Sequence, residues 1–255
     1  MPLVSVNIIT HNRATYIAEA IESVLRQDFS DLELIIVDDA STDNTAEVIK
    51  PFLSDKRVSY FLLPKQKNIA AVRNFALSKS QGKYIAVLDS DDMWSEDKKI
   101  SQQYAFLENN LDISLVGTGA IIIDSSGAEK RKTLKPSTDE DIKKVILLKN
   151  PFFHSSTMYR REVIMGLGGY GENLKYCDDF DLWLRLNATE KFYNFPEFWI
   201  KYREHSDNES AKNFWRAVKE VLLTIKKYRK ETGFGIFIFV KKILNKLFSF
   251  ISPRG

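Results

Sequence analysis

Residues 84–92, YIAVLDSDD, place five mostly apolar residues directly before three carboxylates within four positions. A short apolar run that is punctuated at both ends predicts a strand buried on both faces, as in a parallel sheet. Asp89, Asp91 and Asp92 would then lie at the carboxyl end of this strand, where open α/β sheets bind ligands. Such clustered acids favour a hard cation, Mg²⁺ or Mn²⁺. A solvated acidic turn, with Asp92 near a helix start, explains this stretch alone equally well.

Strand-like and amphipathic segments alternate around this stretch over the first hundred residues. The expected strands are 4–10, 33–37, 58–62 and 84–88, and the expected helices are 17–25, 43–53 and 70–80. This spacing predicts an α/β fold, with a Rossmann-like, mostly parallel central sheet and helices on both faces. Neither GxGxxG nor GxxxxGK[ST] occurs, which argues against a dinucleotide-binding fold and a P-loop kinase.

The second half of the chain is less regular. The expected strands are 113–117, 120–123 and 155–159, the expected helices are 100–107, 141–148 and 179–186, and 166–171 is expected to be a loop. Ser137-x-x-Glu140 has the form of a capping box. Because no boundary-like segment interrupts the chain, we expect one domain over residues 1–210, followed by C-terminal helices over 211–255.

Composition and charge narrow the class of protein. The 255 residues are 44% hydrophobic and 28% charged, as in a soluble globular protein, and the single cysteine, Cys177, fits a reducing compartment. The N-terminus enters a strand at once, so no secretory signal is expected. From Lys226 onward eight basic residues stand against the one acid Glu231, although the whole chain is only +3. The body is therefore mildly acidic, which argues against nucleic-acid binding, and the basic tail points to docking.

The last 23 residues have an amphipathic pattern. Apolar residues of segment 233–255 recur at helical spacing opposite Lys241, Lys242 and Lys246. The unbroken apolar run 234–240 is far shorter than the roughly 18–20 residues that span a bilayer. Such a helix suits the surface of an anionic membrane. The alternative is a helix packed on the body or on a second subunit.

Five motifs occur in an order that points to a family: VSVNIITHNR at 4–13, ELIIVDDASTDNT at 33–45, NIAAVRNFAL at 68–77, YIAVLDSDDMW at 84–94 and CDDFDLWLRL at 177–186. Over roughly residues 3–205 the chain resembles the family 2 glycosyltransferases. The resemblance implies the GT-A fold and an inverting enzyme that uses a nucleotide-activated sugar. It also implies a nucleotide-binding half over 1–95 and an acceptor-binding half over 96–210.

The resemblance assigns roles on the nucleotide side. Thr10, Asn12 and Asp39 look like nucleotide contacts, with Asp39 accepting a hydrogen bond from the N3–H of uracil. Asp89-Ser90-Asp91 looks like the DxD signature. Its second aspartate, Asp91, would bind Mn²⁺ or Mg²⁺ directly, and Asp89 would hold the ribose or the water shell of the metal.

The remaining roles concern the sugar, the diphosphate and the acceptor. Asp92 is similar to the residue that touches the donor sugar, and Arg73 is placed to reach the diphosphate. His205, in a segment similar to one that closes over the diphosphate, could bind metal or phosphate, although a lone histidine is more often a surface residue. Asp178-Asp179 resembles an acidic pair, usually Glu-Asp, whose second member is the catalytic base. That assigns the base to Asp179, with Asp178 as the alternative.

The sequence therefore predicts a metal-dependent, inverting transfer from a UDP-sugar to an acceptor hydroxyl. By family analogy the acceptor is a lipid-linked saccharide of surface polysaccharide synthesis. The basic amphipathic tail predicts an enzyme that is peripheral on the cytoplasmic face of the cell membrane. Two alternatives stay open. One is a dehalogenase-type phosphotransfer enzyme. Such enzymes generally have a nucleophilic aspartate after the first strand, where this chain has Thr10-His11-Asn12. The other is a catalytically silent nucleotide-binding subunit.

Overall fold

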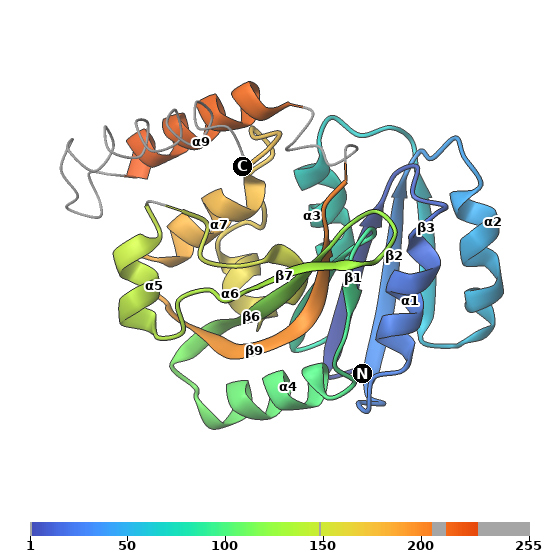
Figure 1. The fold of residues 1–255 in the computed structure, drawn as a ribbon, viewed down its shortest axis with the longest axis horizontal. Coiled ribbons are helices and arrows are strands. Elements are labelled where there is room, and N and C mark those ends of the chain that lie inside the picture. The colour runs from blue at the N-terminus through green and yellow to red at the C-terminus, as the bar shows by residue number, and fades with distance from the viewer. Residues whose placement is uncertain (1, 148, 206–212, 229–255) are drawn as a thin grey trace.

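The computed structural model describes residues 2–147, 149–205 and 213–228 (Figure 1). Strands and helices alternate through its first part. In chain order they are β1 (Val4–Thr10), α1 (Ile17–Leu25), β2 (Leu32–Asp39), α2 (Thr45–Ile49), the 3₁₀ helix η1 (Lys50–Ser54), β3 (Val58–Leu63), α3 (Ile69–Lys79) and β4 (Tyr84–Asp89).

The second part contains shorter helices and longer strands. They are β5 (Met93–Trp94), α4 (Lys99–Asn109), β6 (Ile113–Ile123), β7 (Glu129–Thr133), α5 (Asp139–Val145), the 3₁₀ turn η2 (His154–Ser156), β8 (Met158–Arg160), α6 (Arg161–Gly166), α7 (Asp178–Leu186), β9 (Lys191–Arg203) and α9 (Phe214–Tyr228).

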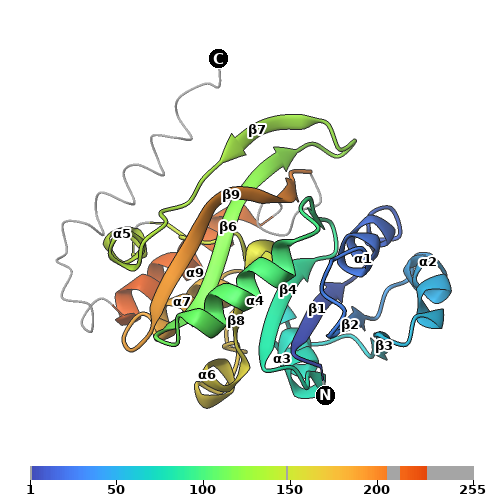
Figure 2. The ribbon, with the colours of Figure 1, turned by 90° about the horizontal axis from the view of Figure 1, so that it is seen from below.

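All strands belong to one sheet in the order β3-β2-β1-β4-β8-β6-β9-β5, with β7 paired to β6. The four strands from β3 to β4 are parallel to their neighbours. Beyond β4 the sheet is mixed, because β8 runs antiparallel to β4 and β6 while β9 runs parallel to β6 (Figure 2). The prediction of an α/β fold with a mostly parallel sheet is confirmed, and the antiparallel pairs are confined to its second half.

The alternation of side chains along the strands creates one core on each face of the sheet. On β4, Tyr84, Ala86 and Leu88 pack in a core with residues of α1 and α4. Ile85 and Val87 point the other way and pack with residues of α3 and α7. The two cores bury β4 on both faces, as its apolar run predicts, and they hold its acidic end at the edge of the sheet.

Three local predictions in the second half are wrong. The segments 113–117 and 120–123 form a single strand, because Thr118 and Gly119 continue the pairing with β9 through a register shift. The capping box is displaced by one residue: the Thr138 side chain accepts from the backbone N–H of Asp141 at 3.3 Å. The side chain of Ser137 instead donates to the carbonyl of Asn194.

The predicted strand 155–159 is also wrong at its start. Residues 154–156 form a 3₁₀ turn, closed by hydrogen bonds from Ser156 N–H to Phe153 and from Thr157 N–H to His154, so β8 begins at Met158. The expected loop 166–171 follows a helix that the pattern did not predict, α6. Gly168 and Gly169 have φ of +78° and +74°, a region that favours glycine.

Helix α9 lies against α7 in both views (Figures 1 and 2). Its buried residues Ile225 and Tyr228 join the core beneath α7, so residues 214–228 pack on the body of the protein. In the described part of the chain no helix is both long and apolar enough to cross a membrane. The predicted amphipathic segment 233–255 lies outside the described residues.

Candidate active site

The loops after β1 and β2 are joined through Asn12. This residue adopts a φ of +52°, which asparagine tolerates better than most residues. Its side-chain oxygen accepts from the backbone N–H groups of Thr42 at 2.7 Å and Asp43 at 3.3 Å. The backbone N–H of Asn12 donates to the Ser41 hydroxyl at 2.8 Å. Asn12 therefore holds the two loops at the carboxyl edge of the sheet, and its contact with a nucleotide stays a prediction.

Asp39 and Thr10 lie at the same edge, at the ends of β2 and β1. The Asp39 carboxylate, almost buried, accepts from the Lys65 ammonium and from the backbone N–H of Gln66, both at 2.6 Å. The Thr10 hydroxyl is buried and has no hydrogen-bond partner among the described residues. A buried hydroxyl without a partner is the kind of group that a bound ligand satisfies.

Asp89, at the end of β4, receives hydrogen bonds from three residues in two segments, α3 and η2. Arg73 Nη2 is 3.3 Å and His154 Nδ1 3.4 Å from its Oδ1, and the hydroxyl of Ser155 lies 3.3 Å from its Oδ2. Burial by itself would raise the pKa of Asp89, but His154 and Arg73 hold that pKa well below its usual range. Asp89 is therefore a carboxylate at neutral pH.

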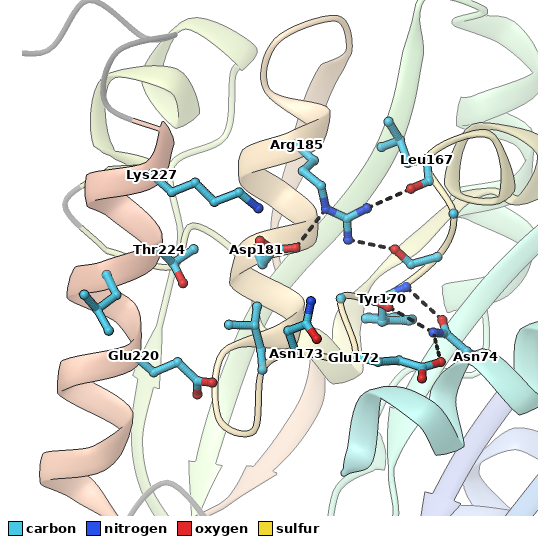
Figure 3. A pocket seen from close by; sticks show the side chains of 15 residues that line it. Asn74, Leu167, Tyr170, Glu172, Asn173, Asp181, Arg185, Glu220, Thr224 and Lys227 are labelled. Carbon is cyan, nitrogen blue, oxygen red and sulfur yellow. Dashed lines mark hydrogen bonds and ion pairs between the residues drawn. The ribbon is translucent and has the colours of Figure 1, made fainter. Parts of the chain in front are cut away.

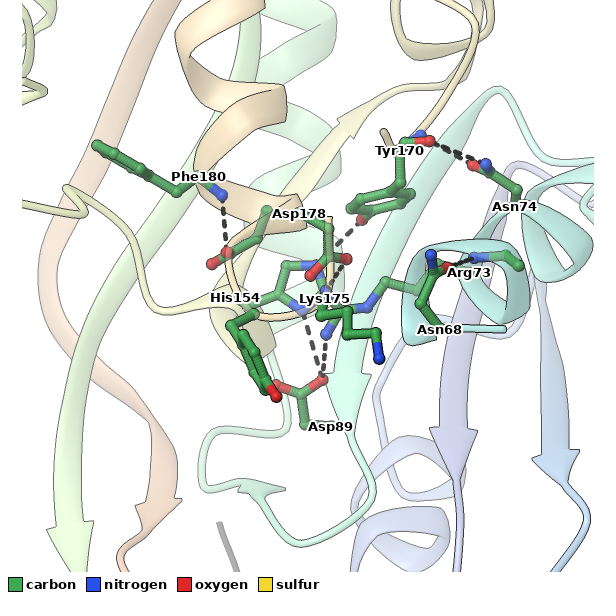
Figure 4. Close-up of polar contacts among 12 residues, drawn as sticks. Asn68, Arg73, Asn74, Asp89, His154, Tyr170, Lys175, Asp178 and Phe180 are labelled. Carbon is green, nitrogen blue, oxygen red and sulfur yellow. Dashed lines mark hydrogen bonds and ion pairs between the residues drawn. The ribbon is translucent and has the colours of Figure 1, made fainter. Parts of the chain in front are cut away.

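The same guanidinium joins Asp89 to the acidic pair of α7. Arg73 Nη1 donates to Asp178 Oδ2 at 2.5 Å, and the guanidinium lies over the ring of Tyr170 (Figure 4). Burial would lower the pKa of Arg73, but Asp178 and Asp89 raise it, so the side chain stays charged. Arg73 thus connects two acidic segments of the predicted site, and its predicted contact with a diphosphate stays a prediction.

The two acids of the pair differ in environment. Asp178 is 3% exposed and engaged by Arg73. Asp179 is partly exposed; its carboxylate accepts from Asn150 Nδ2 and from its neighbour's backbone N–H, that of Phe180, both at 2.7 Å. Burial and then the charge of Asp178 raise the pKa of Asp179. Asp179 is the more accessible acid of the pair, and its role as the catalytic base stays a prediction.

Asn150 is a site residue that the sequence analysis missed. It follows α5 in a loop and reaches Asp179 from 29 positions away. Its backbone carbonyl accepts from Lys135 at 2.9 Å, and burial lowers the pKa of that lysine to about 8. No local pattern marks an asparagine of this kind, because its role depends on the placement of α7.

Asp91 and His205 come together from the two ends of the predicted site. His205 Nε2 lies 3.0 Å from Asp91 Oδ2, although 114 positions separate the residues, and Arg13 Nε lies 3.4 Å from the same oxygen. Within residues 2–147, 149–205 and 213–228, no three His, Cys, Asp or Glu side chains form a group that could hold a metal. The Asp91 carboxylate is an oxygen ligand of the kind that Mn²⁺ and Mg²⁺ prefer, with a diphosphate and water as further ligands.

Asp92 is the most enclosed of the three acids after β4. One oxygen accepts from the Ser155 hydroxyl and the other from the backbone N–H of Arg203 at 2.8 Å. Burial, then the charges of Asp91 and Asp89, raise the pKa of Asp92 well above its usual range. Its interactions tie the end of β4 to the end of β9, and its contact with a sugar stays a prediction.

A separate cavity of about 680 Å³ lies between α7, α9 and the loop 167–174 (Figure 3). Its wall includes Arg185, whose guanidinium donates to Asp181 and to the carbonyls of Leu167 and Gly169. Of the residues predicted to form the site, the lining contains none. The cavity is also lined by Glu220 and Thr224 of α9. These two side chains contact Tyr176 and Cys177, the residues just before the acidic pair.

The sequence matches the model of glycosyl transferase family 2 over residues 5–168. It is 33% identical over 254 residues to a Bacillus subtilis (strain 168) protein named as the glycosyltransferase EpsE, covering 97% of this chain and 90% of that protein. It is 32% identical over 243 residues to the O-antigen biosynthesis glycosyltransferase WbnJ of Escherichia coli, covering 92% and 93% of the two chains.

Solved structures share the fold. The structure of TarS residues 1–349 from S. aureus matches with a TM-score of 0.71 and 20% identity, covering 98% of this chain and 73% of that one. The same protein has been solved in complex with UDP-GlcNAc. The mannosyltransferase PcManGT from Pyrobaculum calidifontis, in complex with GDP-Man and Mn²⁺, matches with a TM-score of 0.67 and 18% identity, covering 89% and 64%.

Proposed function

Since the chain belongs to glycosyl transferase family 2 and is a glycosyltransferase, we propose that it moves a sugar from a UDP-sugar to an acceptor hydroxyl in one inverting, metal-dependent displacement. The observation that carries this proposal is the position of Arg73. One guanidinium joins Asp89 of the DxD segment to Asp178 of the acidic pair. The metal-binding and proton-accepting groups then belong to a single site.

Asp179 is the proposed catalytic base. As the acceptor oxygen attacks the anomeric carbon, its proton passes to Asp179 and the bond from that carbon to the diphosphate breaks on the opposite face. The raised pKa of Asp179 makes it a stronger proton acceptor, and Asn150 fixes the orientation of its carboxylate. Asp178 is occupied by Arg73, which leaves one accessible carboxylate for a single displacement and supports inversion.

The proposed metal ligands are Asp91 and His205, with Asp89 nearby in the same DxD segment. Bound there, Mn²⁺ or Mg²⁺ would neutralise the charge that develops on the departing diphosphate. The separation of 3.0 Å between Asp91 and His205 supports this assignment, as does the Mn²⁺ in the complex of PcManGT.

The nucleotide is proposed to lie along the ends of β1 and β2. Thr10 and Asn12 would contact it there, and Asp39 would accept a hydrogen bond from the N3–H of uracil. The unpartnered hydroxyl of Thr10 supports this position. The UDP-GlcNAc complex of TarS supports a UDP-sugar. Arg73 would reach the diphosphate and Asp92 the donor sugar.

The proposed acceptor is a lipid-linked intermediate of a surface polysaccharide. Support comes from WbnJ, whose name places it in O-antigen biosynthesis. The basic, amphipathic segment 233–255 supports a peripheral position on the cytoplasmic face of the cell membrane, held by anionic lipids.

The test is a panel of nucleotide sugars incubated with the enzyme and Mn²⁺, with release of nucleoside diphosphate as the readout. We expect release from one UDP-sugar, its loss on chelation, and its loss in Asp91→Ala and Asp179→Ala. Binding of UDP without turnover of any donor would instead indicate a silent nucleotide-binding subunit. The anomeric configuration of the product, measured by NMR, tests inversion.

A further inference from the structure

One stripe of α9 contacts the segment that carries the proposed base. Glu220, Thr224 and Tyr228 are spaced by four residues, so they lie on the same face of the helix. We propose that this stripe, and Glu220 above all, holds residues 175–181 in place and thereby positions Asp179. The inference rests on the proposed role of Asp179 as the base.

Glu220 makes the strongest of these contacts. Its two carboxylate oxygens accept from the backbone N–H groups of Lys175 and Tyr176, both at 2.7 Å. Hydrogen bonds from N–H groups to an ionised carboxylate are about twice as strong as those between neutral groups. One side chain of α9 therefore fixes two successive peptide groups immediately before the acidic pair.

The other two members of the stripe extend the contact into α7. The Thr224 hydroxyl lies 3.5 Å from the Cys177 sulfur, a sulfur hydrogen bond within the core. The Tyr228 hydroxyl donates to Asp181 Oδ1 at 2.9 Å. The contacts of α9 thus run along the chain on both sides of Asp179.

Residues 171–177 are also held at Glu172, by hydrogen bonds from Asn68 to its carbonyl and from Asn74 to its carboxylate. They form neither helix nor strand, and Cys177, the residue that precedes α7, provides no side-chain cap. A hydrogen bond from Leu174 N–H to the Gly171 carbonyl closes the turn. The cavity of about 680 Å³ adjoins this segment and is lined by Glu220 as well (Figure 3). Between Glu172 and α7, the peptides of Lys175 and Tyr176 are held by the Glu220 hydrogen bonds.

The position of this segment matters because the proposed base must meet the acceptor hydroxyl at hydrogen-bond distance. Asp179 is fixed on one side by Asn150. On the other side its place follows from the start of α7, which depends on the peptides that Glu220 holds. A displacement of about 1 Å in such a group can lower the rate by up to about a hundredfold.

The test compares Glu220→Ala and Glu220→Gln with Lys219→Ala, a change at an exposed neighbour on the same helix. We expect Glu220→Ala to lower kcat about 10- to 100-fold while the KM for the nucleotide sugar stays within about twofold. Glu220→Gln keeps one acceptor oxygen and should recover part of the loss. Lys219→Ala should behave like the wild type.

A second measurement does not depend on turnover. Hydrogen exchange of the amides in residues 174–179 should become faster in Glu220→Ala, while exchange in β1 and β4 stays unchanged. If all donors leave the wild-type enzyme inactive, the proposed function fails. If the wild type is active and Glu220→Ala retains its kcat and its slow exchange, the positioning role of Glu220 is overturned.

Discussion

The two acidic segments of the site are held in place by different means. Asp89 ends a strand that is paired on both sides and buried on both faces, so the ladder of backbone hydrogen bonds determines its position. Asp179 lies in the first turn of a helix that follows an irregular segment, and its position depends on single side chains from elsewhere, Asn150 and Glu220. The backbone pairing of the sheet therefore fixes the position of Asp89, whereas the position of Asp179 depends on a few side-chain contacts.

The strongest test of this difference is the base itself. We expect Asp179→Asn to lower kcat by about 10² to 10⁴ with the fold intact, because asparagine keeps the size of the side chain but cannot take a proton. Steady-state kinetics, with circular dichroism as a control, measure the effect. If Asp178→Asn is inactive and Asp179→Asn is active, the base is Asp178.

The link between the two segments should dominate stability. Arg73→Met leaves the buried carboxylate of Asp178 without its cation and removes one partner of the half-buried Asp89, which should cost about 3–5 kcal/mol in free energy of unfolding. Urea denaturation measures the change. Lys79→Met, at an exposed position on the same helix, should stay within about 0.5 kcal/mol. A decrease of less than about 1 kcal/mol in the free energy of unfolding of Arg73→Met would mean that Asp89 and Asp178 do not need Arg73 for stability.

Two glycines precede the base, Gly166 at the end of α6 and Gly169 in the loop that follows it. Gly169 has a φ of +74°, and a Cβ there would lie 2.4 Å from Asn74 Oδ1, the atom that accepts from Tyr170 N–H. Gly169→Ala should therefore cost about 1–3 kcal/mol in thermal or urea unfolding. Gly166→Ala meets nothing within 4 Å and should be close to neutral. Equal stability of the two variants would contradict this account of the loop.

The pH dependence of the reaction distinguishes Asp179 from Asp89, because the pKa values of these two acids are shifted in opposite directions. Burial and Asp178 raise the pKa of Asp179, and the base works only when deprotonated, so kcat/KM should fall as pH drops through that raised pKa. The pKa of Asp89 is lowered, so it stays ionised through the same range. A pH–rate profile should lose its acid limb only when the base is replaced. An acid limb at the ordinary carboxyl pKa of about 4 would be at odds with the raised value.

The smallest effect on catalysis is expected at the C-terminus. Deletion of 233–255 should leave turnover of a soluble acceptor within about twofold of the wild type, because α9 and its contacts remain. The same deletion should abolish co-sedimentation with anionic liposomes, because it removes the basic amphipathic segment. Unchanged co-sedimentation would contradict the membrane role.

The first half of the fold could be predicted almost residue by residue. The ends of β1, β2, β3 and β4 lie within two residues of the expected limits, because each strand is a short apolar run bounded by turn residues. The second half could not. Whether Thr118 and Gly119 interrupt a strand, or whether Ser137 or Thr138 caps a helix, is decided by contacts with β9.

The residues of the site divide in the same way, into those that the sequence could predict and those that only the structure brings together. The sequence indicated Asp39, Asp89 and Asp91 by their positions after buried strands, and the acidic pair by its resemblance to a family motif. Three features required the tertiary structure: the bridge through Arg73, the orientation of Asp179 by Asn150, and the hold of Glu220 on the peptides before α7. These contacts join residues 16 to 105 positions apart, and hydrogen bonds over such separations depend on the packing of whole elements rather than on any local pattern.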